Sequence, residues 1–526
     1  MRSKIKENYL VLLSWLLLLF SMLCMYSTFD ENHFELFINS DTVGLPNLYR
    51  DIVYDYGDLK YWSWASAPNL FPDAVLFYLT SFFVRENIVT VSYVYALIQL
   101  LLMTGMLVFI YKKIVPEKFR KTHWLIPVFF SLYFIEAYYF SHDASFGFYI
   151  LTYSYHAGPF INCLIALCFY FSALKFAFKL SILTLIVFIG SFSDKLFIVM
   201  LIAPLVLTLL VNQVWKWKAI LKTFLLLTGF GIACYLGLYL YEWIGEEKLI
   251  VFMAPHKIYN FGEMEPSALL FIEQMTNYIL IPGFRSIQIV FTFLSIFAGI
   301  YYFFKYRKST DNHLAFFGAF YVFFCVGTFL APIINGNYTG YDTLRYNVYP
   351  FYFSSLMFAI LITAGLVNKP IKGTIKTISL FAMAVLFVMV IAKFKGNGLK
   401  TYFDYYPETV AEIDSVAKVH HFTKGLSEYW TAKRTTMLSK EKVKILSVYN
   451  DVSMKELGSN ISWYYSGDFD FVVADGLKPE SVSKHFTVKD TIKTKHYTIL
   501  AVEKYFFPQG KYFPENVNKI DTNVVK

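Results

Sequence analysis

The stretch "YLVLLSWLLLLFSMLCMYSTF", residues 9–29, is an uninterrupted apolar run that is long enough to cross a bilayer as one helix. It is longer than the core of a signal peptide, and no small-x-small cleavage site follows it, so we expect a retained membrane helix. The rest of the 526-residue chain continues in this manner, with 20% aromatic residues and a positive mean hydropathy. The sequence therefore predicts a polytopic α-helical membrane protein.

Apolar runs of spanning length recur along the chain, and we predict about eleven membrane helices from them. The predicted spans are residues 9–29, 88–111, 123–141, 146–174, 180–193, 196–214, 219–243, 284–304, 313–333, 348–367 and 375–393. The five cysteines all lie in such runs and lack the spacing of a metal site or a disulfide framework, so we interpret them as small buried hydrophobic residues.

The positive charges of the chain lie in short clusters between the predicted spans. These clusters are residues 2–6, 112–121, 175–179, 216–222, 305–308 and 369–376. With eleven spans, all six clusters fall on the same side as the N-terminus, and the positive-inside rule makes that side cytoplasmic. The net charge of +9 thus reports topology and does not indicate nucleic-acid binding. We expect a multi-pass protein of the cytoplasmic (inner) membrane with its C-terminus outside.

Two domains are expected. Residues 1–393 form the membrane domain, which has a large first external loop at 30–87, and residues 394–526 form a small extracytoplasmic α/β domain. Helical patterns in the tail cover 408–422 and 425–440, and short β-branched or aromatic runs predict strands at 442–449, 469–475 and 496–505. Within the external loop, "FPDAVLFYLTSFFV" (71–84) is too short for a span and predicts an interfacial helix.

The acidic residues collect at the external ends of the spans, and the middles of the spans are nearly free of ionisable residues. An ion-coupled transporter usually needs charged groups near the membrane midplane. The pattern instead favours an active site at the external interface, which a lipid substrate reaches from the side. A transporter or flippase for a glycan or a lipid-linked precursor is the alternative, and a structural or assembly protein is a third possibility.

The layout resembles that of the GT-C fold glycosyltransferases, because one span is followed by a long external loop with an early Asp, then by many spans and an external domain. Asp41 in "NSDT" (39–42) matches the position of the catalytic carboxylate of that family. The stretch "TLRYNVYPFYFSSLMF" (343–358) resembles a motif at the start of a late span in the protein mannosyltransferase and aminoarabinose transferase branch. There, Arg345 and Tyr346 match residues expected near the carrier phosphate.

The resemblance implies an enzyme that moves a sugar from a polyprenyl-phosphate carrier to a glycan, lipid or protein acceptor on the extracytoplasmic face, with inversion at the sugar. Asp41 would take the proton of the acceptor hydroxyl or hold a divalent cation. Arg345 would bind the phosphate through two hydrogen bonds, and Tyr346 would donate a third. Besides the possible divalent cation, no cofactor is expected. The implied partners are the lipid-linked donor, the acceptor and membrane lipids.

Other residues compete for a place in this site. Asp30 and Glu31 form an acidic pair nearer the membrane and rival Asp41. We also expect Asp194 and Lys195 of "SFSDKLF" (191–197), and Asp73, to bind substrate, although the position of Asp73 after Pro72 favours a structural role in the first turn of a helix. The remaining interpretations are a solvated helix face for Asp51, Asp55 and Asp58, a buried core role for His156, sugar stacking for Trp62 and Trp64, and weaker site candidates in His142, Asp143, His256, Lys257 and Glu263.

Overall fold

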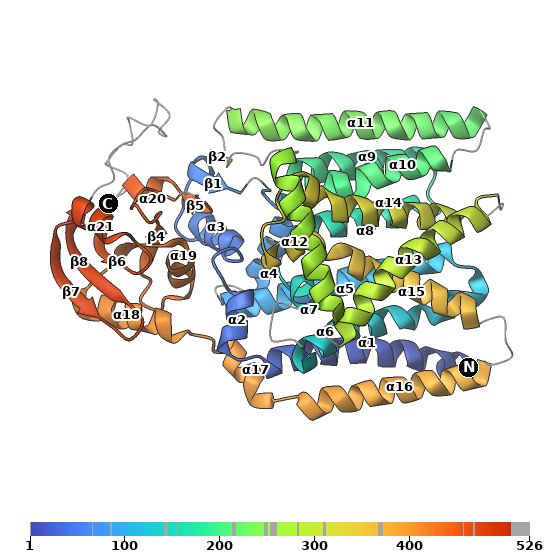
Figure 1. Cartoon of the computed structure of the whole chain (residues 1–526), viewed down its shortest axis with the longest axis horizontal. Coiled ribbons are helices and arrows are strands. Elements are labelled where there is room, and N and C mark those ends of the chain that lie inside the picture. The colour runs from blue at the N-terminus through green and yellow to red at the C-terminus, as the bar shows by residue number, and fades with distance from the viewer. Residues whose placement is uncertain are drawn as a thin grey trace. The chain divides into compact units, whose positions relative to one another are not determined.

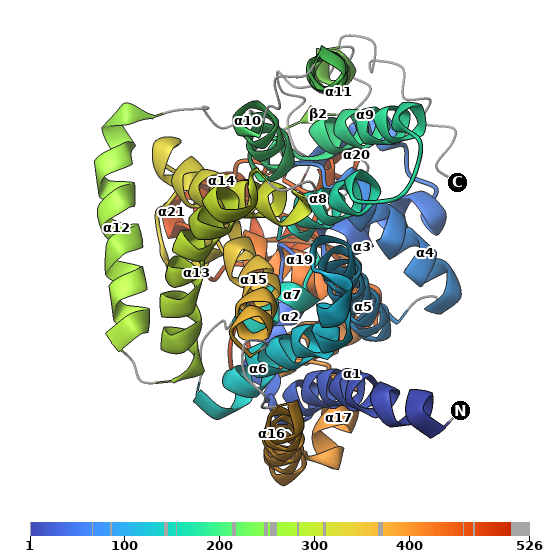
Figure 2. The same cartoon turned by 90° about the vertical axis from the view of Figure 1, so that its right-hand side faces the viewer.

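The first apolar run forms the long helix α1 (Arg2–Thr28), which lies beside α6 and α16 in both views of the molecule (Figures 1 and 2). Leu17 and Cys24 of α1 are buried together with Ile135 of α6 and Met383 of α16. All five cysteines are free, and Cys24 donates to the carbonyl of Val390 within this cluster. The apolar side chains of three helices that are distant in sequence thus form one core.

The computed structural model describes residues 2–505 except 66, 85–86, 141–145, 154, 213–216, 247–250, 253–259, 281–282, 309–311, 367–371, 456 and 466–468. By the density of contacts, the chain divides into two compact units. The first, called here the helical unit, contains residues 1–37, 69–240 and 256–404. The second, called here the mixed unit, contains residues 38–68, 241–255 and 405–526.

The helical unit is built from helices of widely different length. Besides α1 these are α2 (Glu31–Phe37), the π-helical turn η2 (Leu70–Ala74), α4 (Val75–Val84), α5 (Ile88–Ile114), η3 (Glu117–Trp124), α6 (Leu125–Phe140), α7 (Phe146–Leu151), α8 (Ala157–Tyr170), α9 (Phe176–Ser193), η4 (Ile198–Ile202), α10 (Ala203–Val211), α11 (Trp217–Glu246, whose end belongs to the mixed unit), α12 (Phe261–Leu280), α13 (Phe284–Tyr306), α14 (His313–Ile334), η5 (Tyr341–Tyr346), α15 (Tyr349–Leu366), α16 (Lys372–Lys393) and α17 (Gly396–Phe403).

Six helices of the described chain are long and apolar enough to cross a membrane. They are Tyr9–Thr28, Ile88–Ile114, Phe176–Ser193, Ala219–Gly245, Arg285–Tyr306 and His313–Ile334, and a pair bent by 63° after Lys393 makes up to seven. The other predicted spans coincide with shorter helices or with this bent pair. The multi-pass membrane architecture is therefore confirmed, and the structure supports fewer full-length spans than the eleven predicted.

The predicted span 146–174 is wrong, because the run breaks into α7 and α8 between Leu151 and Ala157. His156, directly before α8, has a φ of 63°, which ends any continuous helix there. Gly158 and Pro159 follow immediately, and both residues are typical of a chain that starts a new helix. The break leaves His156 at the N-terminal end of α8.

The spans differ in how far the protein itself buries them. In α14, 61% of the most apolar window is buried, whereas the value for α11 is 17%. The helix α14 packs closely on α13, where a Cβ atom added to Gly318 would lie 2.6 Å from the carbonyl oxygen of Gly299. Small residues that allow such an approach are a common device of membrane helix pairs. The helix α14 is thus central, and α11 leaves most of its surface for lipid.

An ion pair between two helices of the helical unit is largely buried. Arg285, at the start of α13, donates from Nε to Oε1 of Glu136 on α6 at 3.2 Å, and the Glu136 side chain is only 2% exposed. The guanidinium group also lies 4.6 Å from the ring centroid of Tyr278. The helical unit therefore holds a compensated buried charge pair besides the residues that the sequence singled out.

The mixed unit combines part of the first loop with the C-terminal tail. Its elements are α3 (Gly44–Val53), η1 (Leu59–Tyr61), β1 (Trp62–Trp64), β2 (Val251–Phe252), α18 (Glu408–His420), β3 (Lys424–Ser427), α19 (Tyr429–Leu438), β4 (Lys444–Ser447), β5 (Ser459–Asn460), α20 (Ser462–Tyr465), β6 (Phe469–Val473), α21 (Pro479–His485), β7 (Val488–Lys493) and β8 (Thr498–Tyr505).

The tail forms a five-stranded mixed sheet in the order β4-β3-β6-β8-β7, in which β3 is parallel to both β4 and β6, and β8 is antiparallel to β6 and β7. The predicted α/β character is confirmed, as are the three predicted strands. The start of the predicted helix 425–440 is wrong, since 424–427 is strand β3 and α19 begins at Tyr429. A second, small sheet joins loop and tail, because β1 pairs with β5 as well as with β2.

Candidate active site

Four segments of the helical unit bring ionisable side chains together: the turn η2, the N-terminal end of α8, the C-terminal end of α9, and η5. The turn η2 is fixed by its backbone. Ser193 Oγ of α9 accepts from the N–H of Phe71 at 2.8 Å and donates to its carbonyl at 3.1 Å. Asn162 of α8 donates to the same carbonyl at 2.9 Å. The two helices thereby fix the backbone two residues before Asp73.

Asp73 is almost completely buried, with 1% of its surface exposed. Its Oδ1 atom accepts from the hydroxyl of Tyr95 on α5 at 2.9 Å. Its Oδ2 atom lies against Gly158, where an added Cβ atom would come within 1.9 Å, so only glycine fits at that position. Asp73 precedes α4, outside the six candidate spans, and burial raises the pKa of its carboxyl to about 7, with a further contribution from the negative charge of Asp194.

His156 and Asp194 form the polar centre of this group. Nδ1 of His156 lies 2.6 Å from Oδ2 of Asp194, and the side chains are 14% and 4% exposed. The other carboxylate oxygen of Asp194 accepts from the N–H of Leu196 at 2.8 Å. Because Asp194 directly follows α9 and His156 directly precedes α8, the ends of two helices define the geometry of the pair.

The residues of η5 extend the group. The ring of Tyr346 lies 4.9 Å from the ring of His156. The guanidinium group of Arg345 lies 5.3 Å from the ring of Tyr346 and 5.6 Å from that of Tyr155, which precedes His156 in sequence. The hydroxyl of Tyr349 donates to the carbonyl of Tyr155. The structure thus brings the sequence-predicted residues Asp73, Asp194, Arg345 and Tyr346 into one neighbourhood through His156 and Tyr155, which we call the acid–histidine group.

Asp41 belongs to the mixed unit and is described within it. It lies in the turn before α3, and its side chain is half-buried. Its N–H donates to Oδ1 of Asn39 at 3.0 Å, and its Oδ1 atom accepts from the hydroxyl of Tyr429 at 3.0 Å. The predicted base therefore lies in a turn, as the sequence indicated. A tyrosine of the C-terminal tail donates a hydrogen bond to its carboxylate.

Asp51, ten residues further on, overturns an expectation. It was predicted on a solvated helix face, but it is 1% exposed. Its carboxylate accepts from the indole of Trp62 at 2.6 Å, from Asn460 at 2.8 Å and from the indole of Trp463 at 2.9 Å. These donors explain how a carboxylate tolerates burial. They also leave Trp62 engaged and 2% exposed, so its expected stacking on a sugar is wrong.

The remaining candidates lie outside the acid–histidine group or outside the described residues. Lys195 follows Asp194 with a partly exposed side chain. Asp30 is 64% exposed and accepts from His33 at 2.7 Å, and the side chain of its neighbour Glu31 is not described. Asp55 pairs with Lys444, and Asp58 with Lys60. His142, Asp143, His256 and Lys257 lie outside the described residues, and Trp64 is buried.

Sequence reasoning missed His156, which was expected to be a core residue. One signal was present. The predicted span 146–174 is too long for a single crossing, and it contains Gly158 and Pro159 directly after the histidine. A Gly-Pro pair inside an apolar run indicates a new helix start. A histidine at such a start lies at a helix terminus, where polar side chains commonly gather.

The possible divalent cation finds no matching ligand set in the part of the chain that the structure describes. No three side chains from His, Cys, Asp and Glu are placed there to hold a metal ion. In the acid–histidine group, Nδ1 of His156 is bound to Asp194, and Asp73 is directed to Tyr95 and Gly158. These residues therefore do not fit a cation, and no step is assigned to one.

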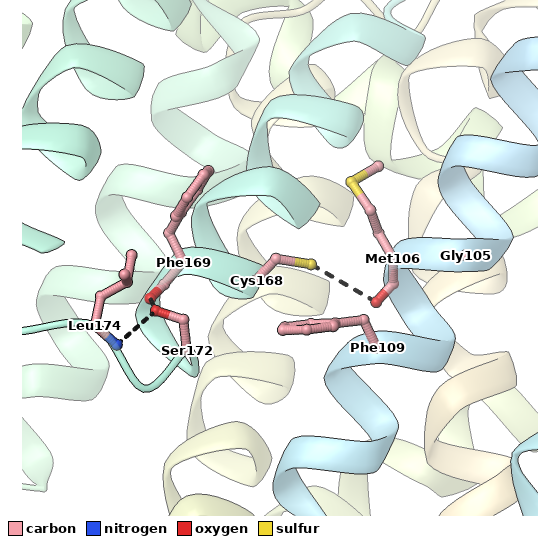
Figure 3. A pocket seen from close by; sticks show the side chains of 7 residues that line it. All are labelled: Gly105, Met106, Phe109, Cys168, Phe169, Ser172 and Leu174. Atoms are coloured by element: carbon pink, nitrogen blue, oxygen red, sulfur yellow. Dashed lines mark hydrogen bonds between the residues drawn. The ribbon is translucent and has the colours of Figure 1, made fainter.

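A surface hollow of about 360 Å³ lies between α5 and α8 (Figure 3). Phe109 and Met106 of α5 line it together with Cys168 and Phe169 of α8. Cys168 Sγ donates to the carbonyl of Met106 at 3.8 Å, and Ser172 accepts from the N–H of Leu174 at 3.4 Å. The lining offers hydrocarbon and almost no polar surface, so it suits an alkyl chain and not a sugar.

No family model matches the chain, and no curated protein matches it. Among solved structures, the chain is similar to the crystal structure of the Archaeoglobus fulgidus oligosaccharyltransferase complexed with Zn and sulfate. The TM-score is 0.38 and the sequence identity 10%, over 93% of this chain and 73% of that chain. So distant a likeness says nothing about the roles of single residues, which follow from the contacts of this chain alone.

Proposed function

We propose that the protein is an integral membrane glycosyltransferase of the GT-C type, which transfers a sugar from a polyprenyl-phosphate carrier to an acceptor on the extracytoplasmic face. The observation that carries the proposal is the acid–histidine group at the helix ends of the helical unit. Buried ionisable groups are costly in a membrane protein and usually mark a functional site. Their position on apolar helices suits a substrate whose lipid part lies in the bilayer and whose sugar reaches the polar residues.

The group offers both kinds of partner that such a donor needs. Carboxylate and imidazole groups of Asp194 and His156 accept hydrogen bonds from sugar hydroxyls. Arg345 and Tyr346 donate, and a guanidinium group matches a phosphate through two parallel hydrogen bonds. The ring of Tyr346 packs against that of His156, so the proposed phosphate-binding and sugar-binding residues lie next to each other.

The proposed reaction is a single displacement at the anomeric carbon of the sugar. The oxygen of the acceptor hydroxyl bonds to that carbon while the bond to the phosphate oxygen breaks, and the electron pair leaves with the polyprenyl phosphate. Asp41 takes the proton of the acceptor hydroxyl. Arg345 stabilises the charge that grows on the leaving phosphate. One displacement inverts the configuration at the anomeric carbon.

The proposal is tested with the purified full-length protein in lipid bilayers, supplied with synthetic short-chain polyprenyl-phosphate hexoses and with a membrane extract as the acceptor source. The readout is released polyprenyl phosphate. We expect Arg345→Met to raise the KM for the donor about 10- to 100-fold, because it removes a charge-assisted phosphate contact. Arg307→Met is the matched control, since Arg307 is also an arginine above aromatic rings, but an exposed one at the end of α13.

Two results would contradict the proposal at different levels. If Arg345→Met and Arg307→Met have the same KM as the wild type, Arg345 does not bind the phosphate. If the wild type releases no polyprenyl phosphate from any hexose donor in the set, the chain is not a transferase of this class.

A further inference from the structure

The turn that carries Asp41 is built locally by one asparagine. Oδ1 of Asn39 accepts from the N–H of Asp41 at 3.0 Å and from the N–H of Thr42 at 3.1 Å. The hydroxyl of Thr42 closes the turn by donating to the carbonyl of Asn39 at 3.0 Å. This pattern fixes the backbone of Asp41 but leaves the rotation of its side chain undetermined.

The tail supplies a contact to the Asp41 side chain. The hydroxyl of Tyr429, the first residue of α19, donates to Oδ1 of Asp41 at 3.0 Å and lies 3.3 Å from the carbonyl oxygen of Ser40. In return, Ser40 Oγ lies 2.9 Å from the carbonyl oxygens of both Tyr429 and Trp430. The tail thus donates a hydrogen bond to the loop, and the loop donates hydrogen bonds to the tail. All these residues belong to the mixed unit.

Tyr429 is itself rigidly placed. It is 7% exposed and stands at the start of a helix that Glu428 caps, since the Glu428 carboxylate accepts from the N–H groups of Trp430 at 2.7 Å and Thr431 at 2.6 Å. The ammonium group of Lys455 lies 4.4 Å from the centroid of the Tyr429 ring. The capped start of α19 and the ammonium group of Lys455 over the ring together restrict the orientation of the Tyr429 phenol.

We propose that Tyr429 is a positioning residue for the base, so that the C-terminal domain takes part in catalysis by orienting Asp41. This inference rests on the proposed function, in which Asp41 takes the proton of the acceptor. The phenol donates to one carboxylate oxygen and thereby orients the plane of the carboxylate. Tyr429 itself contacts no reacting atom, so its removal changes the rate of the chemical step and leaves donor binding intact.

The experiment compares three variants of the full-length protein in the polyprenyl-phosphate release assay. Tyr429→Phe removes only the hydroxyl. Ser40→Ala is the matched control, because it loosens the same contact between loop and tail without touching the Asp41 carboxylate. Asp41→Asn removes the base. We expect Tyr429→Phe to lower kcat about 10- to 100-fold with a KM for the donor within about twofold of wild type, since a misplaced catalytic group affects the transition state and not the ground state.

Ser40→Ala is expected to keep kcat within about threefold while lowering the melting temperature as much as Tyr429→Phe does. Equal kcat values for Tyr429→Phe and Ser40→Ala would overturn the inference, because the hydroxyl would then serve only to join loop and tail. If Tyr429→Phe does not fold, Asn39→Ala disturbs the same turn with Tyr429 intact. A normal kcat in that variant would likewise overturn the inference.

The assay also separates this inference from the proposed function. An inactive Asp41→Asn variant together with a fully active Tyr429→Phe variant would remove the positioning role alone. An active Asp41→Asn variant would remove Asp41 as the base, and the inference would fall with it.

Discussion

Asp41 and Asp51 lie ten residues apart in the same loop and belong to the same unit, yet their surroundings differ sharply. Asp51 is 1% exposed and accepts from two indoles and an amide, so both of its oxygens are occupied. Asp41 is half-buried in a turn, and one phenol donates to one of its oxygens. A carboxylate that accepts from neutral donors at both oxygens in the interior serves structure, whereas a half-buried carboxylate in a turn remains accessible to solvent.

The comparison also explains why the tail folds onto this loop. Asn460 and Trp463 come from the tail, and Asp51 comes from the first loop, so the buried carboxylate joins segments about 400 residues apart. Tyr429 and Ser40 repeat the arrangement at the turn of Asp41. The domain boundary drawn from the sequence at residue 394 therefore omits a part of the loop that packs with the tail, residues 38–68.

The largest effect is expected from Asp41→Asn. The amide cannot accept the proton of the acceptor hydroxyl, so we expect the rate of sugar transfer to fall by about 1,000-fold or more, with the melting temperature unchanged. Release of polyprenyl phosphate measures the first quantity, and thermal unfolding of the same sample measures the second. Transfer at the wild-type rate would erase the distinction between the two aspartates.

Asp51→Ala should show the opposite result, a large loss of stability with little loss of activity per folded molecule. The substitution leaves three donors without an acceptor, two of them buried, and each buried one costs about 1–3 kcal/mol, so we expect destabilisation by roughly 2–6 kcal/mol. Two of the donors are indoles, Trp62 and Trp463, so tryptophan fluorescence during thermal unfolding reports on the site directly. A melting temperature equal to that of the wild type would show that the buried contacts contribute nothing.

Much of the architecture could be predicted because it depends on local patterns. The apolar runs predicted the membrane helices, and β-branched runs predicted strands β4, β6 and β8. Strand β7 was missed because nearly all of its side chains are exposed, so it lacks the alternation that marks a half-buried strand. Some shorter helices were predicted as full spans, because an apolar run does not reveal a break such as the one at His156.

The candidate site could be predicted only in part, since its residues are joined over long distances in sequence. Asp73, Asp194, Arg345 and Tyr346 stood out as charged or aromatic residues at helix ends. The partner of Asp194 is a histidine 38 positions earlier, and the partner of Asp41 is a tyrosine 388 positions later. Neither pairing leaves a trace in local sequence, because nothing in a charge pattern says which distant element packs against it.

Lys433 extends the comparison to a buried cation in the same unit. It is 4% exposed, and its ammonium group donates to the carbonyl of Gly458 at 2.5 Å and to Ser459. Burial, together with a smaller contribution from the nearby charge of Lys455, lowers the pKa of Lys433 from 10.5 to about 7. Between these two values, the unfolded chain binds a proton that the folded chain does not, so stability rises as the pH is raised through this window.

We therefore expect the melting temperature of the wild type to increase from about pH 7 toward pH 9.5 more steeply than that of Lys433→Met. Replacement of Lys489, an exposed lysine of β7, by methionine serves as the control and should leave the wild-type slope in place. Identical slopes for Lys433→Met and the wild type would show that the lysine keeps its proton when buried, contrary to the neutral form expected here.

The smallest effect is expected from Asp55→Asn, which tests a third acid of the same loop. Asp55 is 36% exposed and lies 3.3 Å from the ammonium group of Lys444, an ion pair at the surface of the mixed unit. Such pairs contribute about 0–1 kcal/mol, because water screens the charges and two flexible side chains must be ordered. We expect a change of melting temperature of at most about 2 °C and an unchanged rate of sugar transfer, measured in the same assays. A loss of activity in this variant would mean that the negative charge of the loop as a whole matters, and Asp41 would then differ from its neighbours only in degree.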